Sequence, residues 1–438
     1  MDHSNRKRVA FHTLGCKLNF AETSTIARSF PEDRFEKVPP GKNADIYVIN
    51  TCTVTETADK KCRQAINRFI KRSPSALIIV MGCYSQLQPD KIASIPGVDF
   101  VLGINEKFNI PSFIDNLEKR EKAEIHSCGL SDTELFNRSF SFGDRTRSFL
   151  KIQDGCDYGC AYCTIPMARG SSKNPEIGIL ADEAKEIAGR GVREIVLTGV
   201  NIGDFGKSTG DSLIKLLKEL VRVDGIERYR ISSIEPNLLT DDIIEIAAGN
   251  KKVLPHFHIP LQSGSNKILG LMRRRYRREI FAERTAAIRK VIPLAGIGAD
   301  IIVGFPGESA ADFDETFRFL EEMPLSYLHV FTFSERPGTV AANLAGKVSP
   351  EEKESRSKML ITLSRQKHLR FLEMNIGADA DVLFERTRVK DMITGYTGNY
   401  IRVEYPWHSG LPGNIRKVRL KNISGREKMT IELIDNYD

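Results

Sequence analysis

The sequence is short of several features, and each absence excludes a class of protein. It has one tryptophan in 438 residues, and its longest apolar run, Ala76 to Cys83, has the length of a strand. About 20 apolar residues are needed to cross a bilayer, so no spanning helix is predicted. The first residues, Met1 to Arg8, are polar and lack the apolar core of a signal peptide. We therefore expect a cytoplasmic protein without membrane contact.

Strong compositional bias is also absent. Hydrophobic residues make up 41% of the chain and charged residues 28%, a balance that excludes a disordered chain, a collagen and a coiled-coil rod. The 64 basic and 57 acidic residues give a net charge of +7, which permits a polyanionic partner without requiring one. At roughly 150 residues per domain, the length predicts two or three domains.

Three stretches of different pattern follow one another. In residues 1–125, strand-like runs alternate with helix-like segments, the last at Ile110–Lys119, which predicts an N-terminal parallel α/β sheet domain. A polar linker is expected at 126–146. Six strand–helix units in 147–375 then predict a central partial (β/α)6 barrel, whose functional residues should follow its strands. Five short alternating segments in 376–438 predict a small C-terminal β-barrel of the size of an oligonucleotide-binding module.

The sharpest local feature is a run of three cysteines, Cys156, Cys160 and Cys163, directly after the first predicted barrel strand. Thiolates are the usual ligands of iron–sulfur clusters, and three at this spacing suit one corner of a cubane cluster whose fourth iron stays open to a ligand. A zinc site completed by a distant residue and cysteines packed in a core are the alternatives at this point. Structural zinc usually takes four protein ligands in recognisable pairs, which favours the cluster.

Three further cysteines, Cys16, Cys52 and Cys83, each follow a predicted strand of the first domain. The carboxyl ends of parallel strands share one edge of a sheet, so these thiols should converge and form a second metal site. The alternative is that they only pack at strand ends, because free cysteine is often buried. Cys62 lies within a predicted helix and Cys128 in the linker, and we expect both to be structural or inert.

The cysteine motifs and several later runs resemble those of the radical S-adenosylmethionine (SAM) methylthiotransferase family. The run Cys156 to Cys163 is similar to the radical SAM motif, and the surroundings of Cys16, Cys52 and Cys83 are similar to the N-terminal motifs of methylthiotransferases. Matching runs continue along the chain: Leu197–Ile202, Ile259–Gly264, Ile302–Glu308 and Phe331–Thr339. The C-terminal module resembles the small RNA-binding TRAM domain. The resemblance covers essentially the whole chain.

This resemblance implies an enzyme that adds a methylthio group to C2 of adenosine 37, beside the anticodon of a tRNA. Cys156, Cys160 and Cys163 would hold the 4Fe-4S cluster that binds SAM, and Cys16, Cys52 and Cys83 an auxiliary 4Fe-4S cluster. One SAM would methylate sulfur, and another would give a 5′-deoxyadenosyl radical. The adenine C2–H bond is neither acidic nor activated, so radical chemistry suits it, and the base would have to be unstacked.

Branches of the family differ in substrate. Leu14–Asn19 and Ala168–Gly170 look most like the branch that acts on N6-threonylcarbamoyladenosine. A branch acting on N6-isopentenyladenosine usually has glutamine after the first cysteine, where this chain has Lys17, and a third modifies an aspartate of a ribosomal protein. The chain departs from the family pattern at Ser171–Asn174, where a more basic stretch is common.

Polar residues that follow the barrel strands are candidates for SAM contacts, because SAM needs polar partners for its ribose and amino-acid ends. An aromatic residue before the last cysteine is expected beside the SAM adenine in related enzymes. The predicted cofactor-binding residues are Tyr162, Thr198, Asn201, Ser233, Glu235 and Gln262. Packing and indirect hydrogen bonding are the alternatives for each. His256 and His258 share one strand face and are expected to be hydrogen-bonded histidines of the barrel, with metal ligation as the alternative.

Two basic clusters are candidates for tRNA contact. Arginine combined with an aromatic side chain is typical of RNA recognition, and phosphate contacts make binding salt-sensitive. The predicted RNA-binding residues are Arg273, Arg274, Arg275, Arg416, Lys417, Arg419 and Lys421, with Arg426 and Lys428 nearby. Solvated charged surface is the alternative.

The expected partners are a tRNA anticodon stem-loop and an electron donor such as flavodoxin or ferredoxin, with the chain a monomer. Two other functions remain open on the sequence. One is a radical SAM enzyme whose auxiliary cluster transfers electrons and whose substrate is a small molecule. The other is a non-catalytic RNA-binding iron–sulfur sensor.

Overall fold

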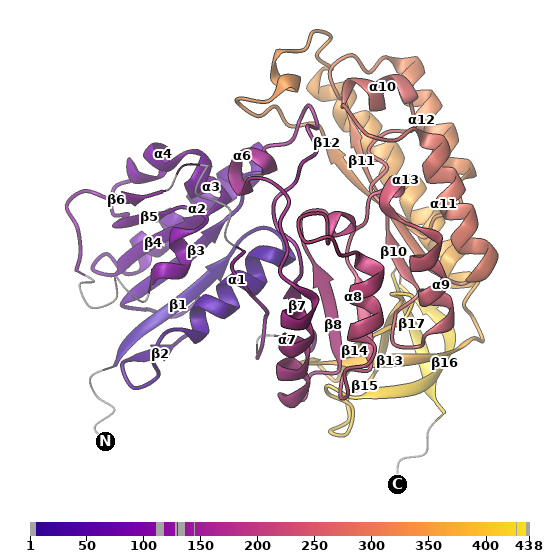
Figure 1. Ribbon diagram of the computed structural model, residues 1–438, viewed down its shortest axis with the longest axis horizontal. Coiled ribbons are helices and arrows are strands. Elements are labelled where there is room, and N and C mark those ends of the chain that lie inside the picture. Colours follow the sequence, from indigo (N-terminus) through magenta and orange to yellow (C-terminus); the bar gives the residue numbers. More distant parts are fainter. Residues whose placement is uncertain are drawn as a thin grey trace.

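A computed structural model describes residues 6–110, 118–127, 129, 136–143, 145–425 and 427–434. Figure 1 shows three parts built on sheets: an N-terminal sheet with its helices, a central set of strands and helices, and a C-terminal barrel that lies beside the central strands. The predicted Ile110–Lys119 helix falls largely outside the described residues, as do Cys128 and Arg426. The fold class predicted from the sequence is confirmed, whereas the predicted domain boundaries stay predictions.

The N-terminal sheet is parallel, with the strand order β2-β1-β3-β4-β5-β6. Its strands are β1 (Lys7–Thr13), β2 (Phe35–Lys37), β3 (Ile46–Thr51), β4 (Leu77–Gly82), β5 (Phe100–Leu102) and β6 (Glu124–His126). Its helices are α1 (Lys17–Arg28), α2 (Glu56–Arg72), α3 (Cys83–Leu87) and α4 (Pro89–Ala93). Every residue of β3 and β4 is buried, because helices cover both faces of the sheet.

The central part contains two parallel three-stranded sheets, β7-β8-β9 and β10-β11-β12. Backbone hydrogen bonds bridge them, from Ile234 N to His258 O (3.0 Å) and from Tyr229 N to Lys252 O (2.6 Å). The strands are β7 (Ser148–Lys151), β8 (Glu194–Thr198), β9 (Arg228–Ile231), β10 (His256–His258), β11 (Gly296–Val303) and β12 (Tyr327–Thr332). The predicted partial (β/α)6 barrel is therefore present.

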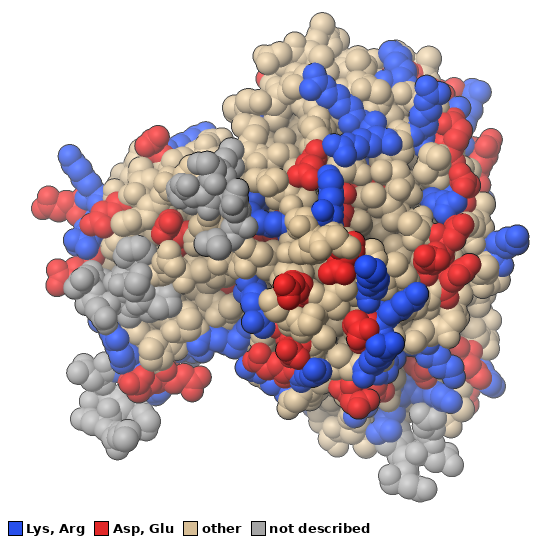
Figure 2. Space-filling view, in the orientation of Figure 1, with Lys and Arg blue, Asp and Glu red and all other residues tan. Residues whose placement is uncertain are grey.

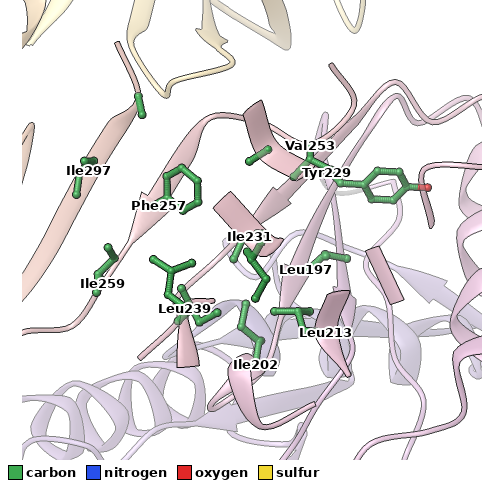
Figure 3. Packing of buried hydrophobic residues seen from close by; sticks show 14 of the residues in the cluster. Leu197, Ile202, Leu213, Tyr229, Ile231, Leu239, Val253, Phe257, Ile259 and Ile297 are labelled. Atoms are coloured by element: carbon green, nitrogen blue, oxygen red, sulfur yellow. The ribbon is translucent and has the colours of Figure 1, made fainter. Parts of the chain in front are cut away.

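Helices pack around these strands and enclose a large apolar core (Figure 3). Leu197 of β8, Ile231 of β9 and Phe257 of β10 belong to this core together with Leu213 of α8. The helices are α6 (Ile165–Arg169), α7 (Ile177–Gly189), α8 (Leu213–Leu220), α9 (Asp241–Gly249), α10 (Asn266–Leu271), α11 (Arg278–Val291) and α12 (Ala310–Glu322). Apolar residues of these helices recur at the helical period, so each helix buries one face.

Helix α13 (Pro350–Glu373) leads from the central part to the C-terminal barrel. Ser349 caps it by accepting a hydrogen bond from Glu352 N, and Ser364 Oγ accepts one from Leu328 N of β12 (2.8 Å). The barrel is closed in the order β13-β14-β15-β17-β16. Its strands are β13 (Asp379–Val389), β14 (Met392–Thr397), β15 (Arg402–Pro406), β16 (Ile415–Ser424) and β17 (Lys428–Leu433).

Buried arginines attach the C-terminal barrel to the central part. Arg228 donates to Tyr396 O, and Arg230 donates to Gly398 O (2.9 Å) and Thr397 O. Both guanidinium groups also contact the Glu194 carboxylate at 2.9 Å. In the described part of the chain, no helix is long and apolar enough to cross a membrane.

Candidate active site

Three cysteines gather in the loop between β7 and α6. Cys156, Cys160 and Cys163 are half-buried and line one cavity of about 620 Å³. The loop turns at Gly155, whose φ is +68° and where a Cβ atom would lie 1.9 Å from Ser171 O. A side chain there would displace the loop, so the tight approach of the backbone requires glycine.

Nitrogen donors point at all three sulfur atoms. Backbone N–H groups donate to Cys156 Sγ and Cys163 Sγ, both at 3.4 Å, and Arg274 Nη1 donates to Cys160 Sγ at 3.0 Å. Burial is the largest effect on the thiols, raising the pKa of Cys156 to about 11 and of Cys163 to about 12. The same donors would stabilise thiolates bound to a metal.

Arg274 reaches the cysteine loop from a buried position, with a side chain that is 3% exposed. Besides Cys160, its guanidinium contacts the Glu235 carboxylate, and it donates to Tyr162 Oη at 3.4 Å. The sequence grouped Arg274 with RNA-contacting residues, but the structure places it inside, against two residues predicted to bind SAM. Its neighbours Arg273 and Arg275 are exposed, and Arg273 lines the cavity of the cysteine loop.

The other three cysteines lie at the carboxyl ends of three adjacent strands. Cys16 follows β1 and caps α1, Cys52 follows β3, and Cys83 begins α3 directly after β4. Burial raises the pKa of Cys52 to about 12, and the nearby thiols of Cys83 and Cys16 add to this effect. The three side chains therefore converge, as the shared strand edge predicted.

Glycines allow these cysteines to approach one another. Gly15 has φ +107°, and a Cβ atom there would lie 2.7 Å from Cys52 Cβ. Cys62 is fully buried and donates its S–H to Cys52 O (3.3 Å), which fits the structural role expected of it.

Helix α6 connects the two cysteine sets. It begins two residues after Cys163, and its Ala168 packs against Cys83 in one apolar cluster. The next residue, Arg169, donates to Asn19 Oδ1 (2.7 Å) and pairs with Asp154 (2.9 Å). The five residues of α6 therefore connect the two cysteine sets.

A buried group of charges surrounds Arg169. Glu22 accepts from Arg169 (3.1 Å), Lys151 (3.1 Å) and Lys107 (2.5 Å). Burial alone would raise the pKa of Glu22, but these three cations outweigh it and hold the pKa well below its usual value. Glu22 is therefore a carboxylate that ties the N-terminal sheet to the cysteine loop of the central part.

A second cavity, of about 590 Å³, opens where the three parts of the molecule meet. Cys16 and Lys17 lie on its N-terminal wall, and Tyr400 belongs to the C-terminal barrel. Arg230 lies within β9, and Ser233 follows that strand. We call it the central cavity. It places one cysteine of the strand-end set beside the carboxyl edge of the barrel strands.

Histidines form part of the central cavity wall. His258 Nε2 lies 2.8 Å from Asp300 Oδ1, and His329 Nδ1 lies 3.3 Å from the same oxygen. These three side chains offer donor atoms within 4.8 Å of one another. His256 Nε2 and His258 Nδ1 both contact Tyr327 Oη, so the two histidines of β10 share a face and are hydrogen-bonded, as expected.

The residues predicted to bind SAM follow several barrel strands but lie in different surroundings. Glu235 and Tyr162 are bonded to Arg274, and Ser233 lines the central cavity. Asn201 donates to Asp204 (2.9 Å), while its Oδ1 is buried without a partner in the described structure. Gln262 has φ +68° and donates its backbone N–H to Asp300 O. Thr198 ends β8 and is buried.

The predicted RNA-binding residues of the C-terminal barrel alternate along β16. Lys417, Arg419 and Lys421 share the exposed face, and Arg416 lies on the other. Arg419 pairs with Asp379 (2.7 Å) and Lys421 with Glu432 (2.5 Å). Figure 2 shows basic and acidic side chains interspersed over the face in view, so the excess positive charge does not form one continuous patch there.

No signal in the sequence indicated that four residues of the site lie together. Lys17, Arg147, Arg230 and Tyr400 come together from three parts of the molecule. Their convergence depends on how the parts pack, which no local pattern encodes. The sequence contains only a weak indication of Asp300, because it is a single acidic residue within the apolar run of β11.

Family models match two segments of the chain. Residues 150–320 match the radical SAM superfamily, and residues 8–103 match a family described as uncharacterized protein family UPF0004. Among solved structures, the radical SAM methyltransferase TsrM from Kitasatospora setae, with cobalamin and a [4Fe-4S] cluster bound, has a TM-score of 0.56 at 13% identity. That similarity covers 77% of each chain and concerns the fold.

Curated relatives match over nearly the full length. Threonylcarbamoyladenosine tRNA methylthiotransferase MtaB of Bacillus subtilis (strain 168) is 40% identical, covering 94% of this chain and 93% of its own. The MtaB protein of Thermotoga maritima is 37% identical over 95% of both chains. A tRNA-2-methylthio-N(6)-dimethylallyladenosine synthase of Syntrophus aciditrophicus is 32% identical, covering 95% of this chain and 92% of its own.

A partial (β/α)6 barrel with three thiols after its first strand, in a segment matched by the superfamily model, defines a radical SAM enzyme. The full-length similarity to curated methylthiotransferases then identifies the family within this superfamily. The chain belongs to the radical SAM methylthiotransferase family, as its motifs indicated.

SAM and 4Fe-4S clusters are accordingly its cofactors, and the residues present fit them. Among the described residues, each set offers three cysteines as ligands, while the nearby Cys62 donates its S–H to Cys52 O. A cubane cluster held by three thiolates would keep one iron open. The orphaned oxygen of Asn201 is the kind of acceptor that a polar ligand satisfies.

Proposed function

We propose that the enzyme adds a methylthio group to C2 of N6-threonylcarbamoyladenosine at position 37 of a tRNA. In this proposal Cys156, Cys160 and Cys163 hold the 4Fe-4S cluster that binds SAM. The strand-end cysteines, Cys16, Cys52 and Cys83, hold the auxiliary 4Fe-4S cluster. When bound, the cofactors supply one-electron chemistry at an unactivated C–H bond and the sulfur that is inserted.

The juxtaposition of the two cysteine sets carries this proposal. Helix α6 follows the loop cysteines and packs on Cys83, and Cys16 lines the central cavity at the barrel edge. Sulfur insertion needs both cofactors close to one substrate carbon, and effective catalysis depends on holding them in fixed geometry. A small-molecule enzyme would need no RNA-sized module, whereas this chain ends in a closed five-stranded barrel.

The chain's own residues orient the reacting groups. Arg274 holds Cys160 and Glu235 together on the barrel side, and Arg169 holds the helix after the loop against Asn19 on the sheet side. We propose that Tyr162, Thr198, Asn201, Ser233, Glu235 and Gln262 contact SAM directly or through these neighbours. The charged side chains around Arg169 are at most 3% exposed, so bulk water does not reach the contact between the two parts.

Relatives support the choice of substrate. The two MtaB relatives described above are 40% and 37% identical to this chain, and the synthase named for dimethylallyladenosine is 32% identical. We further propose that Arg273, Arg275, Arg416, Lys417, Arg419 and Lys421 contact the anticodon stem-loop, that flavodoxin or ferredoxin supplies electrons, and that the chain acts as a monomer. Phosphate contacts by these residues would make the affinity for tRNA fall with salt.

The direct test uses the reconstituted enzyme with SAM, a reductant and anticodon stem-loops carrying threonylcarbamoyladenosine or isopentenyladenosine at position 37. Nucleoside analysis should find the C2-methylthio product from the first substrate only, and none with the Cys156/Cys160/Cys163→Ala variant. Product from isopentenyladenosine alone would assign the enzyme to the other tRNA branch. Cleavage of SAM without either product would overturn the assignment to tRNA.

A further inference from the structure

The central cavity contains a lysine whose charge is not neutralised. Lys17 begins α1 directly after Cys16, and its side chain is exposed to the cavity rather than packed. In the described structure, no carboxylate forms an ion pair with Lys17 and no hydrogen bond engages its ammonium group. A ligand that enters the cavity takes water away from this ammonium group, so a ligand with an anionic group to replace that water is favoured.

Two of the three arginines that line the cavity, Arg147 and Arg230, lie close to carboxylates. Arg230 contacts Glu194 at 2.9 Å, and Arg147 lies 4.0 Å from Glu194 and 3.7 Å from Glu385. Asp300, the acidic group lining the cavity, accepts hydrogen bonds from His258 and His329. Arg145 lines the cavity too, and its guanidinium lies over the Phe20 ring (4.7 Å) without an ion pair in the described structure. On the N-terminal wall, Lys17 is the described cation that remains for a ligand.

The pKa of Tyr400, beside Lys17 in the cavity, indicates that its surroundings are positively charged. Burial alone would raise the pKa of Tyr400, but Arg147, Lys17 and Arg230 outweigh burial and leave the pKa below its usual value. The Tyr400 ring also lies 4.7 Å from the Arg230 guanidinium and 5.8 Å from that of Arg147. A cavity with this field favours an anionic ligand group.

We propose that Lys17 binds the carboxylate of the threonylcarbamoyl group and thereby selects the substrate. This inference rests on the proposed function and identifies the residue that reads the N6 substituent. The isopentenyl group has no charge to offer, and an unmodified adenosine has no substituent. The ring carbon that bears N6 and the carbon C2 flank the same ring nitrogen of adenine, so anchoring the substituent beside Cys16 brings C2 close to the strand-end cysteines.

A phosphate of the RNA is the other anion that Lys17 could meet, and the substrates distinguish the two sources. A stem-loop with threonylcarbamoyladenosine carries the carboxylate, its methyl ester carries the same group without the charge, and an unmodified stem-loop carries only phosphates. Binding is measured on the cluster-loaded enzyme without reductant, so the readout does not depend on turnover.

Wild-type enzyme should bind the acid about tenfold more tightly than the methyl ester, the usual scale of one charge-assisted hydrogen bond. Lys17→Gln should lose this preference and should leave binding of the unmodified stem-loop within about twofold of wild type. Lys17→Arg keeps the charge and should keep most of the preference. Lys185→Gln, on the exposed outer side of α7, is the matched control and should behave as wild type.

Equal binding of acid and ester by the wild-type enzyme would overturn the inference without any variant. Equal weakening of all three stem-loops by Lys17→Gln would assign Lys17 to phosphate contact and also overturn it. Iron content of each variant is measured in parallel, because Lys17 adjoins Cys16. The proposed function fails separately, if wild-type enzyme forms no methylthio product from the threonylcarbamoyl substrate.

Discussion

Among the described residues, Arg274 donates the shortest hydrogen bond to a sulfur of the cysteine loop. It donates to Cys160 Sγ at 3.0 Å from a buried position and is held there by Glu235. Hydrogen bonds and positive charge at a ligand sulfur stabilise the reduced form of an iron–sulfur cluster. In the proposed function, Arg274 therefore sets how readily the SAM-binding cluster accepts an electron.

Arg274→Met should make the reduction potential of that cluster more negative. One hydrogen bond to a charged group corresponds to a shift of about 60 mV for one electron. The measurement is a redox titration followed by electron paramagnetic resonance, on protein lacking the strand-end cysteines so that one cluster is observed. Arg275→Met is the control, because Arg275 bonds Asp157 O on the same loop without touching a sulfur. An unchanged potential in Arg274→Met would contradict this role.

The cysteines could be assigned from the sequence because each follows a predicted strand or lies in one short run. The position of Arg274 beside a cysteine could not be predicted, because Arg274 stands in a basic run whose arginines all look equally exposed in the sequence. Only the backbone distinguishes them: Arg273 has φ +57°, and this turn directs consecutive side chains to opposite sides. Lys17 was visible as a residue that follows Cys16, but not as a cavity residue.

At the scale of elements, the ends of β1, β3 and β4 decide where the strand-end cysteines lie. Gly82 ends β4 with φ +104°, and a Cβ atom there would lie 2.3 Å from Asn50 Oδ1 and 2.6 Å from Thr51 O. Backbone of β3 and the side chain of Asn50 therefore leave no room for a side chain at the position before Cys83.

Gly82→Ala should destabilise the N-terminal sheet by at least about 2 kcal/mol and reduce iron at the strand-end site. The cause is the left-handed backbone together with the clash against Thr51 O. Chemical denaturation and iron analysis measure the two effects. Gly178→Ala provides the control, because a Cβ atom on Gly178 of α7 would meet nothing within 4 Å. Equal stability of the two variants would show that the turn relaxes and would refute the argument.

The long buried strands were predictable because β3 and β4 are continuous apolar runs in the sequence. The three-residue strands β2 and β6 were not predicted. β2 pairs with the longer strand β1, as Phe35 does with Lys7, and β6 pairs with β5 at the edge of the same sheet, as Glu124 does with Phe100. Their own residues carry little periodicity, so tertiary pairing decides their structure.

For the molecule as a whole, buried ion pairs connect the three parts to one another. Glu22 and Arg169 join the N-terminal sheet to the central part, and Glu194 with Arg228 and Arg230 supports the C-terminal barrel. Removing one partner of such a group leaves an uncompensated buried charge. These contacts connect residues far apart in the chain, which is why the sequence predicted the parts but not the central cavity between them.

Glu194 makes the stability of the contact between the central part and the C-terminal barrel depend on pH. Burial alone would raise its pKa, but Arg230, Arg228 and Arg147 lower the pKa from 4.5 to about 2. A carboxyl group with a lowered pKa contributes stability above pH 4.5 and loses it as the pH falls toward 2. Glu194→Gln should therefore reduce the free energy of unfolding by about 3 kcal/mol at pH 7.

Urea unfolding of both proteins between pH 8 and pH 3.5 measures the difference. It should stay constant down to about pH 5 and shrink below pH 4.5. Asp379→Asn is the control, because it removes an exposed pair with Arg419 and should have no measurable effect. A Glu194→Gln difference that grows as the pH falls would contradict the assignment of the charge.

The central claim is that two separate sets of three cysteines each hold a 4Fe-4S cluster, and iron analysis after anaerobic reconstitution tests it most directly. We predict about eight irons per chain in the wild type and about four in either triple variant, Cys16/Cys52/Cys83→Ala or Cys156/Cys160/Cys163→Ala. Cys62→Ala, a buried cysteine outside both sets, should keep about eight. About four irons in the wild type, falling to none when Cys156, Cys160 and Cys163 are replaced, would contradict the second cluster and the sulfur-insertion mechanism built on it.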